Sequence, residues 1–277
     1  MSTRHAGQGG APARRASRAD ADADTERDTG AVTLTAWVQE PSRHALRTRL
    51  LLLLTFAAGW TDALSYLSLD KVFSSFMTGN LLFVGIALVQ GNGALLVRAA
   101  LALVVFLGGV TVGSVSLGRL PQRQSPREWH GTLAHYLTLE GALLLVFAIV
   151  WAISGDPTRH PVTQVILLCI AACAMGVQGG LVGAFAIPDV VSVALTGTVL
   201  LLGQRLAQAL GRRGGDQPGG TTPLFLLALL LSYTLAALLV TLATSFVGIV
   251  FVPCLVVAAI ILLLLMAPDR RGAPHGR

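Results

Sequence analysis

One acidic residue is the most informative of the side chains that could do chemistry, because it lies inside a long apolar stretch. Asp62 follows the Leu-rich run that begins near residue 50, and a charged carboxylate deep in a bilayer costs at least ~2.5–3.5 kcal/mol. Thr55, Gly59, Asp62 and Tyr66 are spaced to share one helix face. We therefore predict proton coupling at Asp62, with a structural hydrogen bond to a nearby chain break as the alternative.

Two polar interruptions, each containing a Thr-Gly pair, occur inside the apolar segments 72–90 and 190–206. Glycine permits unusual backbone angles, and Asn and Thr can satisfy the backbone groups that a broken helix leaves free. Small residues that let two helices pack closely are the alternative interpretation. The predicted substrate or proton pathway comprises Asp62, Tyr66, Thr78, Gly79, Asn80, Gln178, Thr196, Gly197 and Thr198.

The remaining candidates for chemistry are few. We expect Glu140 to lie near the edge of the hydrocarbon and to reach the interface, and the three cysteines, which lie in apolar runs, to be packing residues. The six histidines fall in tails, loops or the ends of apolar runs, without metal-ligand spacing. Neither a phosphate-binding glycine loop nor a nucleophile elbow is present. We therefore predict a protein that is not an enzyme and has no metal or cofactor.

The elements that position these residues are membrane spans. The 277 residues are 53% hydrophobic and 12% charged, whereas soluble domains are roughly 25% charged. The net charge of +6 is better explained by Arg residues in cytoplasmic loops than by nucleic-acid binding, since these residues flank apolar runs. The expected partners are therefore the lipid bilayer and a small-molecule or ion substrate, with no nucleic acid.

We predict an all-α, polytopic transmembrane helical bundle, since about 20 apolar residues cross the hydrocarbon. Clear spans fall at 49–69, 98–118, 135–154, 163–185, 223–243 and 247–267, and shorter segments at 72–90 and 190–206. The fold is therefore six spans plus two short or broken segments, or else eight spans. The predicted regions are a disordered cytoplasmic tail (1–42), the membrane domain (43–270) and a C-terminal tail (271–277).

An internal repeat relates the halves 49–154 and 163–267. Segments 74–88 and 192–206 are identical at six of fifteen aligned positions, and Gly59 aligns with Gly176 across one gap. Equivalent loops of the two halves differ in their Arg content, which favours inverted halves. Inversion needs an odd number of crossings in each half and so favours six spans.

Basic residues predict the orientation. With eight spans, ten Arg residues lie on the inner side and four basic residues on the outer side; with six spans and two re-entrant segments, the numbers are eleven and three. Both arrangements place the two termini in the cytoplasm.

Two motifs carry a family resemblance. The stretch Ala58-Gly59-Trp60-Thr61-Asp62-Ala63, followed by Ser75-Phe76-Met77-Thr78-Gly79-Asn80, resembles the YoaK family of bacterial inner-membrane proteins, a domain of unknown function. The resemblance covers about residues 45–268. It implies a multi-pass protein of the plasma membrane with six or more helices, and it implies no particular substrate.

The functional prediction is a small-molecule or ion transporter of inverted-repeat type, with Asp62 as the titratable group. The alternative is a non-transporting membrane scaffold or assembly partner, in which Asp62 is fully hydrogen-bonded in a packed core. A membrane enzyme ranks third and would need a second deep acid or a histidine beside Asp62.

Overall fold

The structure, a computed structural model, describes residues 44–118, 126–155, 160–184, 195–211, 222–243 and 246–265. Regular structure in these ranges is entirely helical. The elements are α3 (His44–Ser68), α4 (Met77–Gln90), α5 (Gly93–Gly118), α6 (Pro126–Ser154), α7 (Pro161–Ala184), α8 (Leu195–Gly211), α9 (Pro223–Leu242), the 3-10 helix η3 (Val247–Phe251) and α10 (Val252–Leu265). The predicted tails 1–42 and 271–277 lie outside the described residues.

Six helical segments are long and apolar enough to cross a bilayer: α3, α5, α6, α7, α9, and η3 together with α10. The other two helices, α4 with 14 residues and α8 with 17, reach only ~21 and ~25 Å at 1.5 Å per residue, less than the ~30 Å hydrocarbon core. The all-α bundle is therefore confirmed, in the arrangement with six long helices and two short ones. Several boundaries differ from prediction: α3 begins at His44, α4 at Met77, α5 at Gly93 and α6 at Pro126, and α8 covers Leu195–Gly211.

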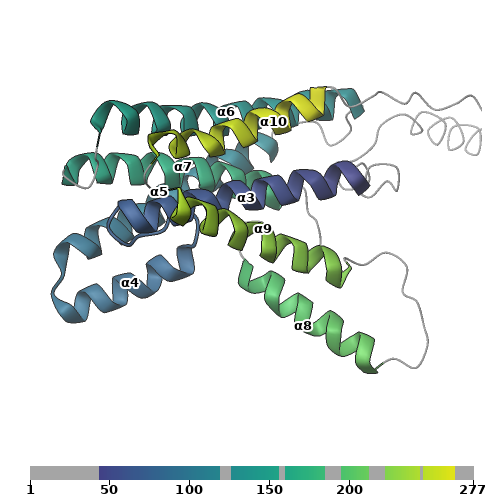
Figure 1. Ribbon diagram of the computed structural model, residues 1–277, viewed down its shortest axis with the longest axis horizontal. Coiled ribbons are helices and arrows are strands. Elements are labelled where there is room, and N and C mark those ends of the chain that lie inside the picture. The colour runs from purple at the N-terminus through teal and green to yellow at the C-terminus, as the bar shows by residue number, and fades with distance from the viewer. Residues whose placement is uncertain are drawn as a thin grey trace, which may run out of the picture.

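The two halves of the chain run in opposite directions. A long helix, a short helix and two long helices follow one another as α3–α6, and the same order recurs as α7–α10. In Figure 1, α3 and α4 run leftward along the bundle, whereas α7 and α8 run rightward. The beginning of α3 and the end of α10 consequently lie at the same end of the bundle.

Helix packing repeats in the same way. Helix α5 packs on α7 as α9 packs on α3, α4 packs on α5 as α8 packs on α9, and α6 packs on α7 as α10 packs on α3. The remaining pairs, α3 with α7 and α6 with α10, each join equivalent helices of the two halves. This pattern is what a two-fold relation between inverted halves requires.

Glycines at equivalent positions allow the closest helix contacts. A Cβ on Gly59 would lie 2.7 Å from the Tyr233 carbonyl oxygen of α9, and one on Gly176 would overlap the Phe106 carbonyl of α5. Gly109 of α5 likewise has no room for a Cβ beside α7. The alignment of Gly59 with Gly176 thus corresponds to a shared role, the close approach that small residues permit between membrane helices.

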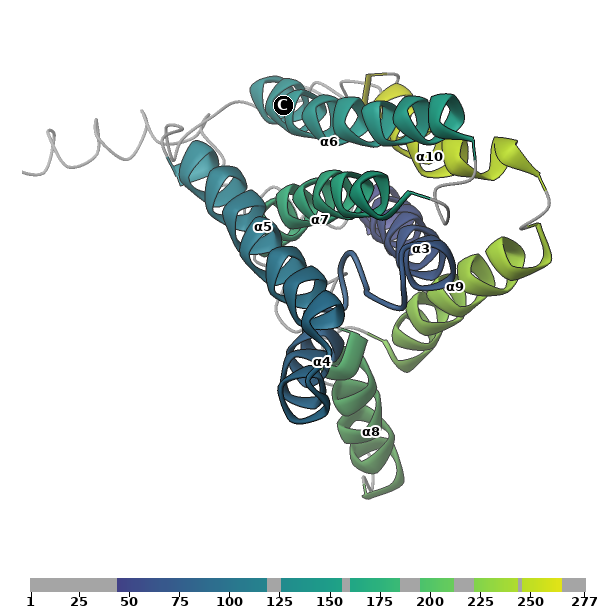
Figure 2. The same ribbon diagram turned by 90° about the vertical axis from the view of Figure 1, so that its left-hand side faces the viewer.

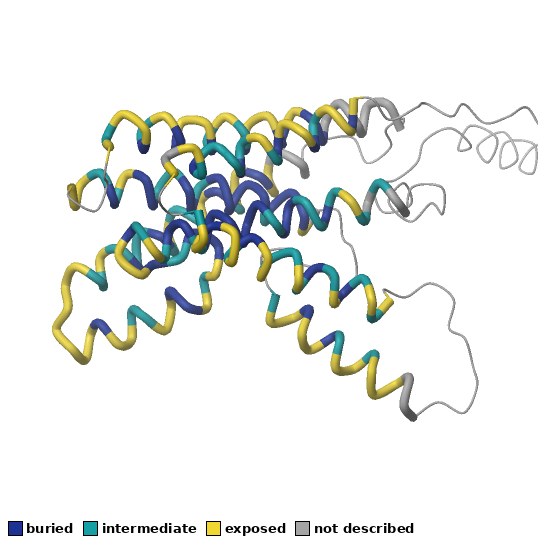
Figure 3. Tube along the Cα trace, viewed as in Figure 1, coloured by how far each residue is buried: buried dark blue, intermediate teal, exposed yellow. Residues whose placement is uncertain are grey.

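Helices α3 and α7 form the centre of the bundle, with α6 and α10 on one side and α4 and α8 on the other (Figure 2). Burial follows this arrangement, since buried positions are densest along the central helices, while the outer surfaces of α4 and α8 are exposed (Figure 3). One group of packed apolar residues, which we call the first core cluster, joins five helices and reaches α8 through Leu201. It includes Leu51, Leu54 and Ala58 of α3, Tyr136, Leu137 and Leu144 of α6, Ala174, Met175, Leu181 and Val182 of α7, Leu226 and Leu229 of α9, and Val257, Ile260 and Leu264 of α10.

Candidate functional site

The Asp62 carboxylate is buried in the bundle, with 2% of the residue exposed. Four donors surround it. Its Oδ1 accepts hydrogen bonds from Ser74 Oγ at 3.0 Å and from Ser75 N at 2.6 Å. Its Oδ2 accepts from Ser75 Oγ at 2.5 Å and from Tyr233 Oη at 2.8 Å. An ionised carboxylate only accepts hydrogen bonds, and these donors satisfy it without a basic partner.

These contacts join three parts of the fold. Asp62 lies on α3, Tyr233 on α9, and the two serines immediately before α4. These contacts are structural hydrogen bonds of the kind predicted as the alternative. The two serine partners lie just before residues 78–80 and not within them. Tyr233 was missed because it lies 171 residues away along the chain, and its surroundings in sequence are those of any apolar span. Proton coupling at Asp62 stays a prediction.

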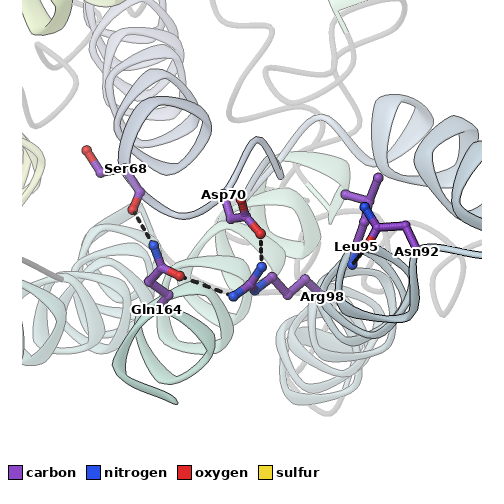
Figure 4. A network of polar contacts seen from close by, with 6 residues as sticks. All are labelled: Ser68, Asp70, Asn92, Leu95, Arg98 and Gln164. Atoms are coloured by element: carbon purple, nitrogen blue, oxygen red, sulfur yellow. Dashed lines mark hydrogen bonds and ion pairs between the residues drawn. The ribbon is translucent and has the colours of Figure 1, made fainter. Parts of the chain in front are cut away.

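Residues 69–76 bring the chain back into the bundle after α3. Since Asp62 lies six residues before the end of α3, the contacts of Ser75 with it imply a return of ~9 Å along that helix. The turn uses Asp70 and Lys71, with φ of 66° and 64°, values that non-glycine residues adopt rarely. An ion pair with Arg98 of α5 holds Asp70 in place (Figure 4).

The same arginine belongs to a network at this end of the bundle (Figure 4). Arg98 donates to Gln164 Oε1 of α7 at 3.2 Å, and Gln164 Nε2 donates to the Ser68 carbonyl oxygen of α3 at 3.2 Å. Nearby, Asn92 caps the start of α5 by accepting from Leu95 N at 3.1 Å. The network therefore fixes the ends of α3, α5 and α7 around the turn.

Aromatic rings fill the space where the returning segment meets α4. Phe73 stacks on Tyr66 with ring centroids 5.0 Å apart and on Phe83 at 5.9 Å, and it meets Phe76 edge-on at 5.2 Å. A Cβ on Gly79 would lie 2.6 Å from the Phe76 ring. The predicted pathway residues Tyr66 and Gly79 thus pack against this segment.

Asn80 satisfies the backbone of the returning segment. Its Oδ1 accepts from Phe73 N at 3.0 Å, and its Nδ2 donates to the Phe73 carbonyl oxygen at 2.7 Å. Asn80 is fully buried, whereas Thr78, two residues earlier, is exposed. Asn80 therefore compensates for freed backbone groups, as expected of an amide side chain at a chain break. Thr78, in the same motif, does not take part in these contacts and is exposed.

The second interruption lies at the start of α8, where Thr196 and Gly197 are exposed and Thr198 is buried. Among the described residues, Thr198 Oγ1 has no hydrogen-bond partner. In both views the beginning of α8 lies near the beginning of α4, and from there the helices diverge (Figures 1 and 2). These beginnings are about halfway along the bundle and on its outer side. The two Thr-Gly segments are thus neighbours in space.

Gln178 lies in the contact between the two central helices. Its Nε2 donates to the Leu54 carbonyl oxygen of α3 at 2.9 Å. Its Oε1 is buried and, within the described part of the chain, has no partner.

Glu140 overturns a prediction. Instead of reaching the interface it is 0% exposed, because its face of α6 packs inside the bundle with Leu137 and Leu144 of the first core cluster. Fourteen residues of helix, or ~21 Å, separate Glu140 from the start of α6. Within the described residues, no group of three or more His, Cys, Asp or Glu side chains gathers where a metal could bind.

Comparison with known proteins agrees with the resemblance in the two motifs. Residues 50–267 match the family described as "Protein of unknown function (DUF1275)". Over 158 residues the chain is 30% identical to the UPF0700 transmembrane protein YoaK of Bacillus subtilis (strain 168), an alignment that covers 57% of this chain and 66% of YoaK. The chain thus spans slightly less than two thirds of that relative's length. No solved structure matches the chain. This multi-pass membrane protein therefore belongs to the DUF1275 family of proteins of unknown function.

Proposed function

We propose that this protein transports a small polar molecule or an ion across the bacterial cell membrane. The observation that carries the proposal is the pair of short helices, α4 and α8, which begin near one another about halfway along the bundle and run to opposite ends (Figure 1). Transporters built from inverted repeats commonly place such broken helices at their substrate site.

Membrane physics supports a binding role for these helix beginnings. Non-helical backbone at the depth of the hydrocarbon is tolerated only where protein buries it or where it lines a water-filled cavity. The start of a helix also carries a partial positive charge. Two such ends, with exposed Thr78 and Thr196 beside them, would suit the polar or anionic group of a solute.

Asp62 is the proposed titratable group, since its contacts connect protonation to the position of α4. A protonated carboxyl carries an O–H and can no longer accept at every site. The hydroxyls of Ser74, Ser75 and Tyr233 can rotate in response, but Ser75 N–H only donates. A proton on Oδ2 leaves the Ser75 N–H bond to Oδ1 in place and turns the hydroxyls of Ser75 and Tyr233 from donors into acceptors. Proton binding would therefore change the contact between α9 and the segment that leads into α4.

Orientation follows from the six-span arrangement. The eleven inner and three outer basic residues of this topology place both termini in the cytoplasm. In this orientation α4 runs toward the outer end of the bundle and α8 toward the inner end. One short helix would then border access from each side of the membrane, as alternating access requires. We keep the proposal that the protein is not an enzyme.

A membrane scaffold or assembly partner is the second candidate. The specific observation in its favour is the complete set of donors around Asp62, the arrangement expected of a packed structural core. The two candidates differ in whether water reaches the beginnings of α4 and α8.

Thiol accessibility tests the proposal without knowledge of the substrate. In a cysteine-free background, lacking the three native cysteines, Thr78→Cys and Thr196→Cys should react with a small charged thiol reagent. Val104→Cys, an exposed apolar position in the middle of α5 (68% exposed), is the control and should stay unlabelled in lipid. If neither threonine position reacts in liposomes while the protein remains folded, no aqueous pathway reaches the site and the scaffold stands.

A further inference from the structure

Glu140 is a second deep acid, with an environment opposite to that of Asp62. It is 0% exposed, and within the described residues neither carboxylate oxygen has a hydrogen-bond partner. Moving an isolated ionised carboxylate into apolar surroundings costs so much that such groups take up a proton or pair with a cation. The side chain therefore needs a neutralising partner that the described chain does not supply.

The surroundings of Glu140 are apolar. It shares a helix face with Tyr136, Leu137 and Leu144, one turn to either side, and these three belong to the first core cluster. On the neighbouring residue Gly141, a Cβ would lie 3.2 Å from Val257 of α10. Glu140 is thus placed where α6 packs onto α7 and α10.

Two other buried side chains in this region have unused oxygens. Thr55 of α3 lies one turn from Leu51 and Ala58, and Gln178 of α7 one turn from Ala174 and from Val182, which places both on faces that form the first core cluster. Thr55 Oγ1 and Gln178 Oε1, like the carboxylate, have no partner in the described part of the chain. All three can accept a hydrogen bond, and none of them brings a positive charge.

The titratable groups facing this region from the packed elements are also uncharged or weakly acidic. They are Tyr136 on α6 itself and Cys254 on α10, whose Sγ contacts the Gly141 carbonyl oxygen at 3.8 Å. The titratable side chains of α7 are Cys169 and Cys173. In η3 the described residues are apolar. No Lys, Arg or His of these described elements neutralises Glu140. A metal ion here would have a single carboxylate as a ligand, because no group of three or more His, Cys, Asp or Glu side chains gathers in the described part of the chain.

We propose that Glu140 is a proton-binding site, separate from Asp62, at which the carboxylate takes up one proton to form a neutral carboxylic acid. Gln178 of α7, the helix on which α6 packs, has a buried oxygen that could accept from the acid O–H. The inference depends on burial and missing partners, and it holds whether or not the protein transports a solute.

Infrared spectroscopy of the full chain in liposomes tests the proposal. A C=O band of a protonated carboxylic acid should be present at neutral pH, should disappear in Glu140→Gln, and should persist in Asp62→Asn. Labelling the wild-type protein with ¹³C-carboxyl glutamate provides a measurement that needs no variant. The chain has four glutamates, at 26, 40, 128 and 140, and a downshift of the band assigns it to glutamate rather than aspartate.

Two outcomes overturn the proposal: spectra of wild type and Glu140→Gln that coincide in this region, or a band that does not shift with labelled glutamate. As a second measurement, dicyclohexylcarbodiimide, which modifies protonated carboxyl groups in apolar surroundings, should attach to Glu140 and leave Asp62 unmodified. A flux experiment on Thr78 or Thr196 variants tests the transport proposal separately, so that failure of one leaves the other standing.

Discussion

At the Asp62 carboxylate, only one of the four donors is unable to change its role. Ser75 N–H and Ser74 Oγ bind Oδ1, whereas the two partners of Oδ2, Ser75 Oγ and Tyr233 Oη, are hydroxyls that can also accept. In Asp62→Asn the amide oxygen can keep the first pair and the NH₂ can donate to the second. We expect the free energy of unfolding to fall by less than ~1.5 kcal/mol, measured by thermal unfolding in detergent.

Asp62→Ala removes every acceptor at once. The Ser75 N–H and three hydroxyls then lie buried without their partner, and an unsatisfied buried group costs about 1–3 kcal/mol. We expect a loss of about 3 kcal/mol or more, well beyond that of Asp62→Asn in the same assay. Equal losses for the two variants would contradict this account and mean that the negative charge itself stabilises the fold.

Asn80→Ala should weaken the same region through the backbone. It deletes both hydrogen bonds to Phe73 and leaves a buried N–H and carbonyl unpaired, so we expect a loss of about 1–3 kcal/mol. Asn92→Ala is the matched control, because it removes an exposed cap worth about 1 kcal/mol. Faster hydrogen exchange at Phe73 in Asn80→Ala, with no change at this site in Asn92→Ala, would locate the effect.

Residue types alone identified Asp62, because a charge inside an apolar run is costly wherever the chain goes. They could not identify Tyr233, which becomes a partner only when α9 packs on α3. Glu140 was expected at the interface because it lies early in the apolar part of α6, whose candidate span begins at Leu133. Its burial comes from packing against other helices, which the sequence of α6 alone does not show.

Among the elements, the contact between α5 and α7 depends most on the absence of side chains. Gly176→Ala would press a methyl group onto the Phe106 carbonyl, and overpacking of this kind costs about 1–3 kcal/mol. Gly183→Ala on the same helix has nothing within 4 Å of its Cβ. Because alanine is favoured over glycine inside a helix by roughly 0.5–1 kcal/mol, that control should be neutral or stabilising in the same unfolding assay.

The short helices were predictable in kind but not in extent. Thr-Gly pairs indicated breaks at both places, and the structure has α4 and α8 beginning within one or two residues of them. Residues 72–76 were predicted within the first short segment, since Val72, Phe73 and Phe76 are apolar. They are non-helical because Asp62 binds the N–H of Ser75 and Asn80 binds the backbone of Phe73. These contacts come from tertiary structure and cannot be read from the local sequence pattern.

For the whole molecule, topology gives a direct test. Alkaline phosphatase fused after Asn92 or after Gly155 should be active, because both positions lie at the outer end of the proposed orientation, and green fluorescent protein fused after Gly211 or after Leu265 should fluoresce in the cytoplasm. Eight crossings would reverse the results at both Asn92 and Gly155. An inactive phosphatase fusion after Asn92 would therefore contradict the six-span arrangement.

The inverted repeat was accessible from sequence because identical residues recur at matching places, as at Gly59 and Gly176. The packing that the repeat produces was not accessible, since which helices touch is decided by side chains far apart along the chain. The halves also differ chemically: Asp62 and Asn80 secure the first break, while the second has exposed Thr196 and a buried Thr198 without a partner among the described residues.

The length of α4 has a consequence for how the chain is made. At ~21 Å, it is too short to be retained as a crossing when it leaves the translocon, and so α3 and α5 must enter the bilayer as opposed neighbours before it. Only then are Tyr66, Arg98 and the Asp62 carboxylate in place to draw residues 69–76 inward. Nascent chains released just after α4 should therefore leave this segment open to added protease, and those released after α9 should protect it.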